Sequence, residues 1–178
     1  PEAILAAVRA GRPVLAEKPL AANLAQALAL AAALPDDARV MMAHTLRFSP
    51  ALITAHELLP ELGEIHRIRV AQRLEPSTIA WQRNAELAGG GSVTLTGVHG
   101  FDLVRWFTGA TPTQVDARLR RLLGHPMENL FDACFEYADQ PLLAACEVSK
   151  FSASRSALLE LVGTQGLCWV VYLGGRLE

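Results

Sequence analysis

Residues 13–44 read PVLAEKPLAANLAQALALAAALPDDARVMMAH, and this segment determines how the N-terminal part of the chain folds. Two short apolar runs, 13–17 and 39–44, flank a run that is rich in alanine and leucine. Asn23 is a good cap for a helix over the middle run, and Pro35 ends that helix. Strand, helix and strand joined by such short connections predict a βαβ unit with a right-handed crossover and parallel strands.

The polar residues that follow these two strands form the first candidate site. Ligands of parallel sheets bind outside the carboxyl ends of the strands, which here carry residues 17–19, EKP, and residues 44–48, HTLRF. We therefore expect Lys18, His44 and Arg47 to lie along one rim. A lysine whose stem packs in an apolar crevice can have a lowered pKa and exchange a proton near neutral pH. The alternative is a solvated lysine at the end of a strand.

The chain changes character near residues 60–64, where Pro60 and Gly63 end a helix that we expect from residue 50. From there apolar and polar residues alternate, as is typical of half-exposed strands, and one further helix is expected over about residues 92–107. The pattern in the second region therefore predicts an open, mostly antiparallel sheet with helices on one face. The expected fold class is α/β for the first region plus α+β for the second. The expected strands are 64–74, 114–122, 130–137, 142–151, 157–162 and 167–173, with a hairpin turn at 164–166 between the last two.

Residues 89–109, GGGSVTLTGVHGFDLVRWFTG, hold the second candidate site. A glycine run opens a helix that places His99, Asp102 and Arg105 at spacings of three residues. Neutral imidazole titrates in the range that general acid–base chemistry needs, so His99 is a candidate proton shuttle. The alternative is a histidine that bonds to Asp102 on a half-buried helix face. The three glycines lack the spacing of a dinucleotide-binding loop and favour a tight turn instead.

Composition excludes several classes of function. A net charge of −2 without a basic stripe argues against a nucleic-acid partner. No apolar run reaches the roughly 18 residues of a membrane span, and no signal-peptide pattern is present, so we expect a soluble, cytoplasmic protein without a membrane partner.

Cys134, Cys146 and Cys168 fall in apolar strand-like runs, which favours reduced thiols in the core. No CxxC or HxxxH pair is present, and we expect no metal site.

The chain resembles the Gfo/Idh/MocA family, the group of glucose-fructose oxidoreductase and inositol dehydrogenase. The resemblance runs in order through AGRPVLAEKPLA, MMAHTLRFSPAL, ELGEIHRIRV, ELAGGGSVTLTGVHGFDLVRWFTG and LLELVGTQG. It implies that residues 1–62 are the C-terminal part of a Rossmann domain, which binds NAD or NADP. It also implies that residues 63–178 are an α+β domain that shapes a sugar or polyol site and forms a homo-oligomer through its sheet.

The family also implies roles for individual residues. The expected reaction is the NAD(P)-dependent oxidation of a CH–OH group in a sugar, polyol or cyclitol. Lys18 and His99 match the catalytic lysine and histidine. The matching positions on the cofactor side are Glu17, Lys18, Pro19, His44 and Arg47.

Two departures from the family pattern qualify these expectations. Leu95 stands where members commonly have an aspartate one helical turn before the catalytic histidine. The alternative function is therefore an inactive member that senses a nucleotide or sugar, or that acts through protein contacts. No glycine-rich strand, turn and helix for the pyrophosphate precedes Pro1. We accordingly expect an interior fragment, also truncated after Glu178, that is inactive by itself.

Overall fold

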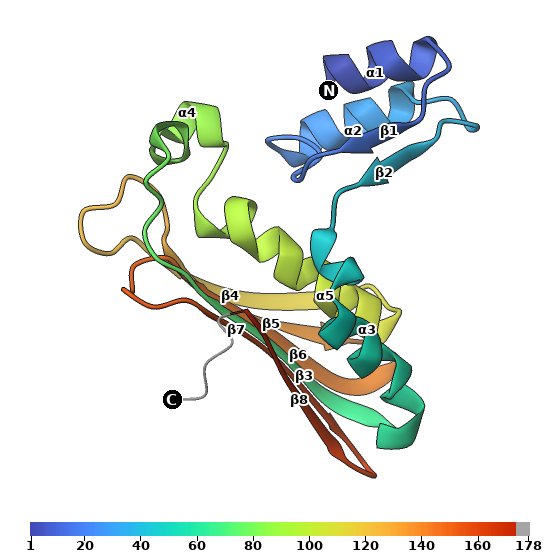
Figure 1. The fold of residues 1–178 in the computed structure, drawn as a ribbon, viewed down its shortest axis with the longest axis vertical. Coiled ribbons are helices and arrows are strands. Elements are labelled where there is room, and N and C mark those ends of the chain that lie inside the picture. The colour runs from blue at the N-terminus through green and yellow to red at the C-terminus, as the bar shows by residue number, and fades with distance from the viewer. Residues whose placement is uncertain (174–178) are drawn as a thin grey trace.

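The computed structural model describes residues 1–173, and their N-terminal part is a small parallel unit (Figure 1). Its elements are α1 (Glu2–Arg9), β1 (Val14–Ala16), α2 (Leu24–Ala33) and β2 (Val40–Met42). The two strands pair in parallel, with Val14 opposite Val40. The Asn23 side chain accepts a hydrogen bond from the backbone N–H of Gln26 at 2.9 Å, so the expected cap begins α2. The predicted order of strand, helix and parallel strand is confirmed.

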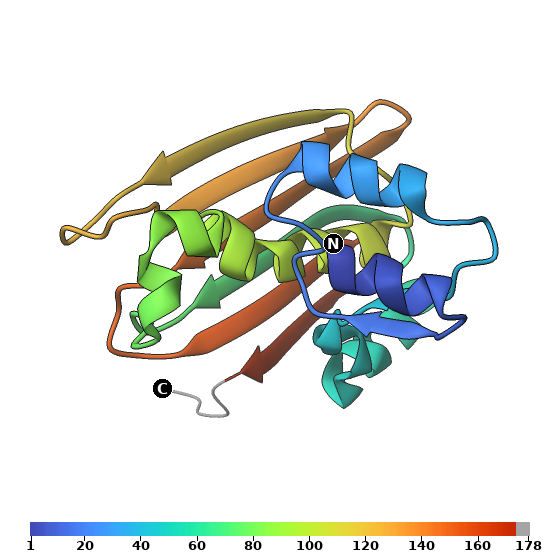
Figure 2. The same cartoon turned by 90° about the horizontal axis from the view of Figure 1, so that it is seen from above.

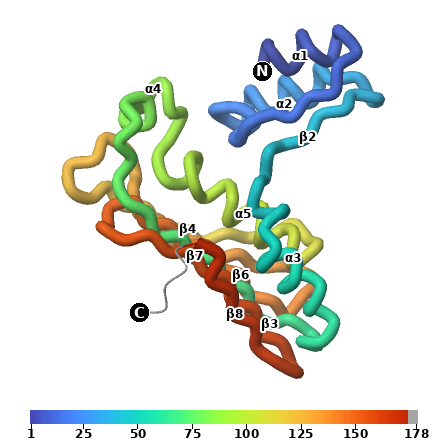
Figure 3. The backbone as a smooth tube through the Cα atoms, in the orientation of Figure 1, coloured from blue at the N-terminus to red at the C-terminus, as the bar shows by residue number. Residues whose placement is uncertain are grey.

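A short helical connection leads from this unit to a larger sheet, as the tube in Figure 3 shows. A 3₁₀ turn (Thr45–Phe48) is followed by α3 (Pro50–Glu57) and by a second 3₁₀ turn (Leu59–Leu62). Gly63 then redirects the chain with a φ of 73°, a conformation that side-chain-bearing residues rarely adopt. Leu52 and Ala55 of α3 are almost completely buried in the core of the sheet. Helix α3 thus anchors the connection on the sheet.

Six strands form an open, mixed sheet in the order β4-β5-β6-β3-β7-β8. Strands β3 and β6 are parallel, and every other neighbouring pair is antiparallel. The expected mostly antiparallel sheet is therefore confirmed, as is the last hairpin turn, where Gly163 N–H donates to the carbonyl of Gly166 at 2.9 Å. The strands are β3 (Ile65–Arg73), β4 (Gln114–Arg120), β5 (Leu130–Tyr137), β6 (Gln140–Ser149), β7 (Ser156–Gly163) and β8 (Leu167–Leu173).

Helices cover one face of this sheet, and Figure 2 shows them from above. The segment comprises a 3₁₀ turn (Ala80–Arg83), α4 (Ala85–Ala88), a π-helical turn (Val93–Gly97) and α5 (Val98–Thr108). The sequence predicted one regular helix here, but its first turn is π-helical, a form that is frequent at functional sites. The three glycines form the expected tight turn, with Gly89 at a φ of 68°. No helix within residues 1–173 has the length and apolar character to cross a membrane.

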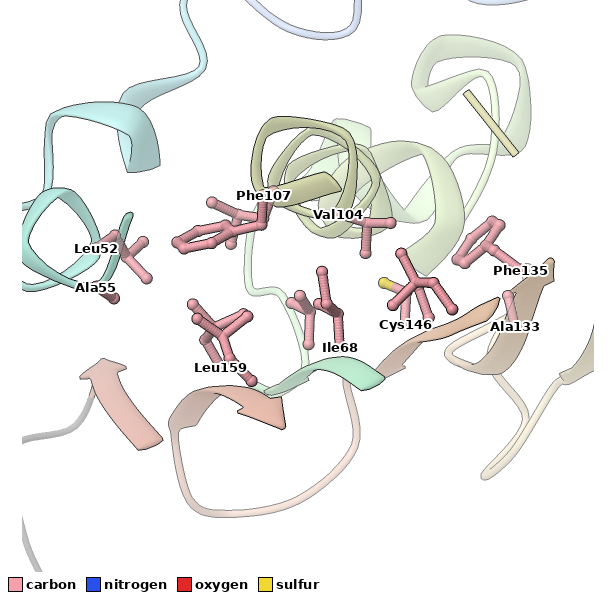
Figure 4. Packing of buried hydrophobic residues seen from close by; sticks show 14 of the residues in the cluster. Leu52, Ala55, Ile68, Val104, Phe107, Ala133, Phe135, Cys146 and Leu159 are labelled. Atoms are coloured by element: carbon pink, nitrogen blue, oxygen red, sulfur yellow. The ribbon is translucent and has the colours of Figure 1, made fainter. Parts of the chain in front are cut away.

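The core lies between this helical layer and the sheet (Figure 4). Phe107 and Val104 of α5 face Ile68, Cys146 and Leu159, which come from three neighbouring strands. All five are buried, and apolar burial of this kind is the dominant favourable term in folding. The core therefore fixes the position of α5 over the sheet.

Two expectations about exposure were wrong. Strand β4 is exposed along its whole length, because it is an edge strand that the helical layer does not cover. Cys134 is exposed on the outward face of β5, whereas Cys146 is buried and Cys168 partly buried. All three thiols are free, as expected.

Gly100 sets how closely α5 approaches the sheet. A Cβ atom at this position would overlap the Sγ atom of Cys146 and would lie 3.5 Å from Cγ1 of Val70. Both neighbours are completely buried on central strands and have little room to move. A residue without a side chain is therefore required at this point of the helix.

Replacing Gly100 with alanine should lower the free energy of unfolding by roughly 1–3 kcal/mol, the usual range for an overpacked core. The loss is expected although alanine alone would favour the helix by about 1 kcal/mol. Urea denaturation measures the change. The double variant Gly100→Ala, Cys146→Ala should recover part of the loss, because the smaller side chain makes room. Equal stability of Gly100→Ala and the unaltered protein would contradict the close approach.

Candidate active site

Helix α5 has one face on the sheet and another that is turned away from it. The residues buried against the sheet are Gly100, Leu103, Val104 and Phe107. His99 and Asp102 are three residues apart and therefore share a different face of the same helix. The packing that buries the first set directs the second set toward the N-terminal unit.

Lys18 lies at the carboxyl end of β1, and its side chain reaches the π-helical turn. Its Nζ atom donates a hydrogen bond to the carbonyl oxygen of Leu95 at 2.7 Å. Burial lowers the pKa of Lys18 below its ordinary value, and the nearby charge of Glu17 opposes that shift. The lysine is therefore partly buried and held by a hydrogen bond, and is not a fully solvated residue at the end of a strand.

Lys18 and His99 line the same cavity, which has a volume of about 300 Å³. Its walls also include Leu95 and Thr96 of the π-helical turn, Gln72 of β3 and Arg155 from the loop before β7. Among the described residues, none that lines this cavity is an aspartate or a glutamate. Two segments far apart in the sequence thus meet in one hollow that contains an ammonium group and an imidazole.

His99 is held in its neutral form by its surroundings. Burial and the positive charges of Lys18 and His44 lower the pKa of His99 to about 4, although Asp102 and Glu17 act in the opposite direction. Its buried Nδ1 atom has no hydrogen-bond partner among the described residues. A neutral imidazole with an unused nitrogen is suited to accept a proton or a hydrogen bond from a ligand.

Asp102 is bonded to Arg47 and not to His99. The guanidinium of Arg47 donates from Nε and Nη2 to the two carboxylate oxygens, both at 2.8 Å, and the Asp102 side chain is only 10% exposed. His44 Nδ1 lies 3.7 Å from the same carboxylate. The alternative in which Asp102 bonds to His99 is therefore wrong, and the Arg47–Asp102 pair instead joins the connection that follows β2 to α5.

A second and larger hollow, of about 780 Å³, runs along the N-terminal unit. Glu17, Lys18 and Pro19, three of the residues predicted to lie on the cofactor side, line it. Its walls are mostly apolar, and Lys18 and Leu95 border both hollows. The two hollows therefore adjoin at these residues.

The cofactor-side residues predicted from the sequence divide into two groups. Glu17, Lys18 and Pro19 line the larger hollow, whereas His44 and Arg47 line neither hollow and lie at the Asp102 carboxylate. Sequence reasoning missed the cavity residues Gln72 and Arg155. Gln72 had a detectable signal, because it is a polar residue at an inward-facing position of an alternating strand. Arg155 lies in a loop, where no pattern in the sequence indicates that it reaches the cavity.

Residues 1–173 contain no cluster of three or more histidine, cysteine, aspartate or glutamate side chains that is arranged to hold a metal ion.

Comparison with known families and structures gives consistent matches. The family model described as the GFO/IDH/MocA C-terminal domain matches residues 54–168. The structure of GenD2 from gentamicin A biosynthesis in complex with NAD superposes with a TM-score of 0.87 and 31% sequence identity. That match covers 97% of this chain and 51% of GenD2.

Two further solved structures share the fold at lower identity. Levoglucosan dehydrogenase, in complex with NADH and levoglucosan, has a TM-score of 0.87 and 22% identity, covering 96% of this chain and 51% of its own. A putative myo-inositol dehydrogenase from Sinorhizobium meliloti 1021 has a TM-score of 0.85 and 19% identity, covering 95% and 53%. The chain thus spans about half the length of the solved structures it matches.

His99 is expected to remain neutral from pH 7 down to about pH 4, because burial and nearby positive charge oppose its protonation. The imidazole signals of ¹³C-labelled histidine, followed by NMR during an acid titration, measure this pKa. In Lys18→Met the pKa of His99 should rise, since one of the opposing charges is gone. A His99 that titrates at its ordinary value of 6.5 in the unaltered protein would contradict the buried site.

Proposed function

The chain belongs to the Gfo/Idh/MocA family of oxidoreductases, and we propose that the protein containing it is an NAD- or NADP-dependent dehydrogenase acting on a secondary hydroxyl of a sugar, polyol or cyclitol. The observation that carries this proposal is the cavity that Lys18 and His99 share beside the larger hollow. Because the chain spans about half of its solved relatives, the activity is proposed for the whole protein.

His99 and Lys18 divide the proton chemistry in this proposal. His99 is neutral at pH 7 and takes the proton of the substrate hydroxyl during oxidation. The Lys18 ammonium, fixed by the Leu95 carbonyl, stabilises the negative charge that develops on that oxygen. In the reverse direction His99 returns the proton. The bound dinucleotide supplies the hydride chemistry, while the protein supplies positioning.

The remaining residues act through position. Glu17, Lys18 and Pro19 contact the nicotinamide end of the dinucleotide, since they line the larger hollow. His44 and Arg47 act on the cofactor side indirectly: with Asp102 they join the unit that carries Lys18 to the helix that carries His99. A shift of about 1 Å between catalytic groups can cost on the order of a hundredfold in rate, so this link supports turnover.

Leu95 favours a second candidate, an inactive relative that senses a nucleotide or sugar. Its side chain lines the cavity one helical turn before His99 and can neither bond a sugar hydroxyl nor share a proton. The complete protein incubated with NAD or NADP and a panel of sugars distinguishes the two. A change in cofactor absorbance supports the dehydrogenase, whereas sugar binding without any change supports the sensor.

His99→Asn and Lys18→Met in the complete protein should each lower kcat by roughly a hundred- to ten-thousandfold, the usual contribution of a positioned proton-transfer group. Steady-state absorbance of the reduced cofactor measures the rate. Arg105→Met is the matched control, because Arg105 is exposed on the same helix and lines neither hollow. Rates that match this control in either site variant would overturn the assignment.

We further propose that the uncovered face of the large sheet pairs with a second copy of the protein. Trp169 and Val171 of β8 and Leu143 of β6 are 66%, 51% and 52% exposed on this face. Arg69 and Glu147 form an ion pair at its centre, so the face also carries both signs of charge. A surface that combines apolar groups with both charges can complement itself across a two-fold axis.

Trp169→Lys should shift the protein from dimer toward monomer, because it places a charge at the most exposed apolar position of the face. Analytical ultracentrifugation measures the mass in solution. Leu123→Lys is the control, since Leu123 is 84% exposed but lies outside the strands, in the connection between β4 and β5. An unchanged mass in Trp169→Lys, or a monomer before substitution, would refute self-association through this face.

A further inference from the structure

Leu95 lies at the boundary between the two hollows of the candidate active site. Among residues 1–173, only Lys18 and Leu95 line both the cavity of His99 and the larger hollow. In the proposed reaction a hydride leaves the substrate in the cavity for the dinucleotide in the larger hollow, so the reacting carbon has to lie where the two hollows meet. The reacting carbon and its nearest neighbours in the sugar therefore lie against Leu95.

The polar groups at this boundary are already engaged. The ammonium of Lys18 donates to the carbonyl oxygen of Leu95 at 2.7 Å, and its proposed role is at the reacting oxygen. An ammonium group donates hydrogen bonds but cannot accept one, and the side chain of Leu95 can do neither. A second sugar hydroxyl held against this side chain would therefore have no acceptor for its proton.

Other polar groups line the cavity away from the boundary. Thr45, Gln72 and Thr96 line the cavity but not the larger hollow. Gln72 is only 5% exposed, and its Oε1 atom has no hydrogen-bond partner among the described residues. Buried amides are normally paired, so this one is suited to a hydroxyl of a ligand. The cavity thus combines a polar region around Gln72 with an apolar boundary at Leu95.

The charges around the cavity favour a neutral sugar. None of the described residues that line it is an aspartate or a glutamate, so the ammonium group of an amino sugar would meet Lys18 without a negative partner. The guanidinium of Arg155 is exposed and bonds the carboxylate of Glu75 at 2.9 Å. Its charge is therefore already paired, and Lys18 is the cation that remains for the reacting oxygen.

We propose that the substrate is a neutral deoxy sugar, which lacks a hydroxyl on a carbon beside the one that is oxidised. This inference rests on the proposed dehydrogenase function and deepens it by naming the substrate class. The deoxygenated carbon packs against Leu95, where burial of its apolar surface is favourable. A hydroxyl in its place would be buried without a partner. Leu95 is then a specificity-determining residue of an active enzyme, and the volume of about 300 Å³ suits a single sugar ring.

The affinity of the complete protein for matched sugars tests this inference. The probes are D-glucose and D-galactose, together with the 2-, 3- and 4-deoxy forms of each. Calorimetry with NADH or NADPH present measures binding without turnover. At least one deoxy form should bind about ten- to a hundredfold more tightly than its parent, the range in which an apolar pocket disfavours an added hydroxyl. If no deoxy form binds more tightly than its parent, the inference is refuted.

Substitution of Leu95 locates the source of this preference. Leu95→Asn should abolish it, because asparagine has nearly the size of leucine and supplies a donor and an acceptor without a charge. Leu95→Met keeps the boundary apolar and should keep the preference. Gln72→Leu is the matched control in the same cavity, and it should weaken binding of the parent and the deoxy sugar in parallel, since Gln72 does not border the larger hollow.

The quantity compared is the ratio of two affinities in one variant, which partial loss of folded protein leaves unchanged. A ratio that stays the same in Leu95→Asn, or that Gln72→Leu lowers as strongly, would overturn the role of Leu95.

Turnover separates this inference from the function on which it rests. If the complete protein oxidises the parent sugars with a kcat/KM at least as high as that of every deoxy form, the deoxy-sugar inference fails while the dehydrogenase proposal stands. If a deoxy sugar binds preferentially through Leu95 but the absorbance of the cofactor never changes, the specificity of the site stands and the dehydrogenase proposal fails.

Discussion

The whole arrangement depends on one constraint, that helix α5 has to fit two surfaces at the same time. On one side Gly100 allows the helix backbone to lie almost against Cys146 and Val70 of the sheet. On another side the Asp102 carboxylate accepts hydrogen bonds from Nε and Nη2 of Arg47, which lies in the segment that follows β2. His99 lies between these two attachments, and its position is determined by both. The steric limit at Gly100 and the ion pair at Asp102 together hold α5 against the sheet and against the segment that follows β2.

Burial then gives the groups in the cavity their chemical character. Partial burial of Lys18 and His99 disfavours the charged form of each, and the positive charge of Lys18 lowers the pKa of His99 further. The imidazole loses its proton at a lower pH than the ammonium does, because its ordinary pKa is lower. The cavity therefore holds a neutral base beside an ammonium group. The carbonyl of Leu95 satisfies that ammonium without neutralising it. Had a carboxylate stood at position 95, its negative charge would have raised the pKa of both neighbours.

Local patterns in the sequence predicted most of the fold and the two segments that carry Lys18 and His99. The strand before residue 17, the Asn23 cap and the glycine turn before α5 all depend on neighbouring residues, and such signals are readable from sequence. The partnership of Arg47 with Asp102 spans 55 residues and leaves no local trace, so Asp102 was assigned to the wrong partner. Alternation in residues 114–122 showed that two faces differ, but not whether anything covers them. Arg155 reaches the cavity only through tertiary packing.

The position of β3 in the sheet has a consequence for how the protein is made. This strand ends at residue 73, yet its two neighbours, β6 and β7, begin only at residues 140 and 156. On the ribosome its apolar side chains, such as Ile68 and Val70, therefore emerge long before anything can pair with them. Such an unpaired strand is a template for association with other chains, and contacts over this sequence distance form slowly. Newly synthesised copies thus pass through an interval in which they depend on dilution or on chaperones to avoid aggregation.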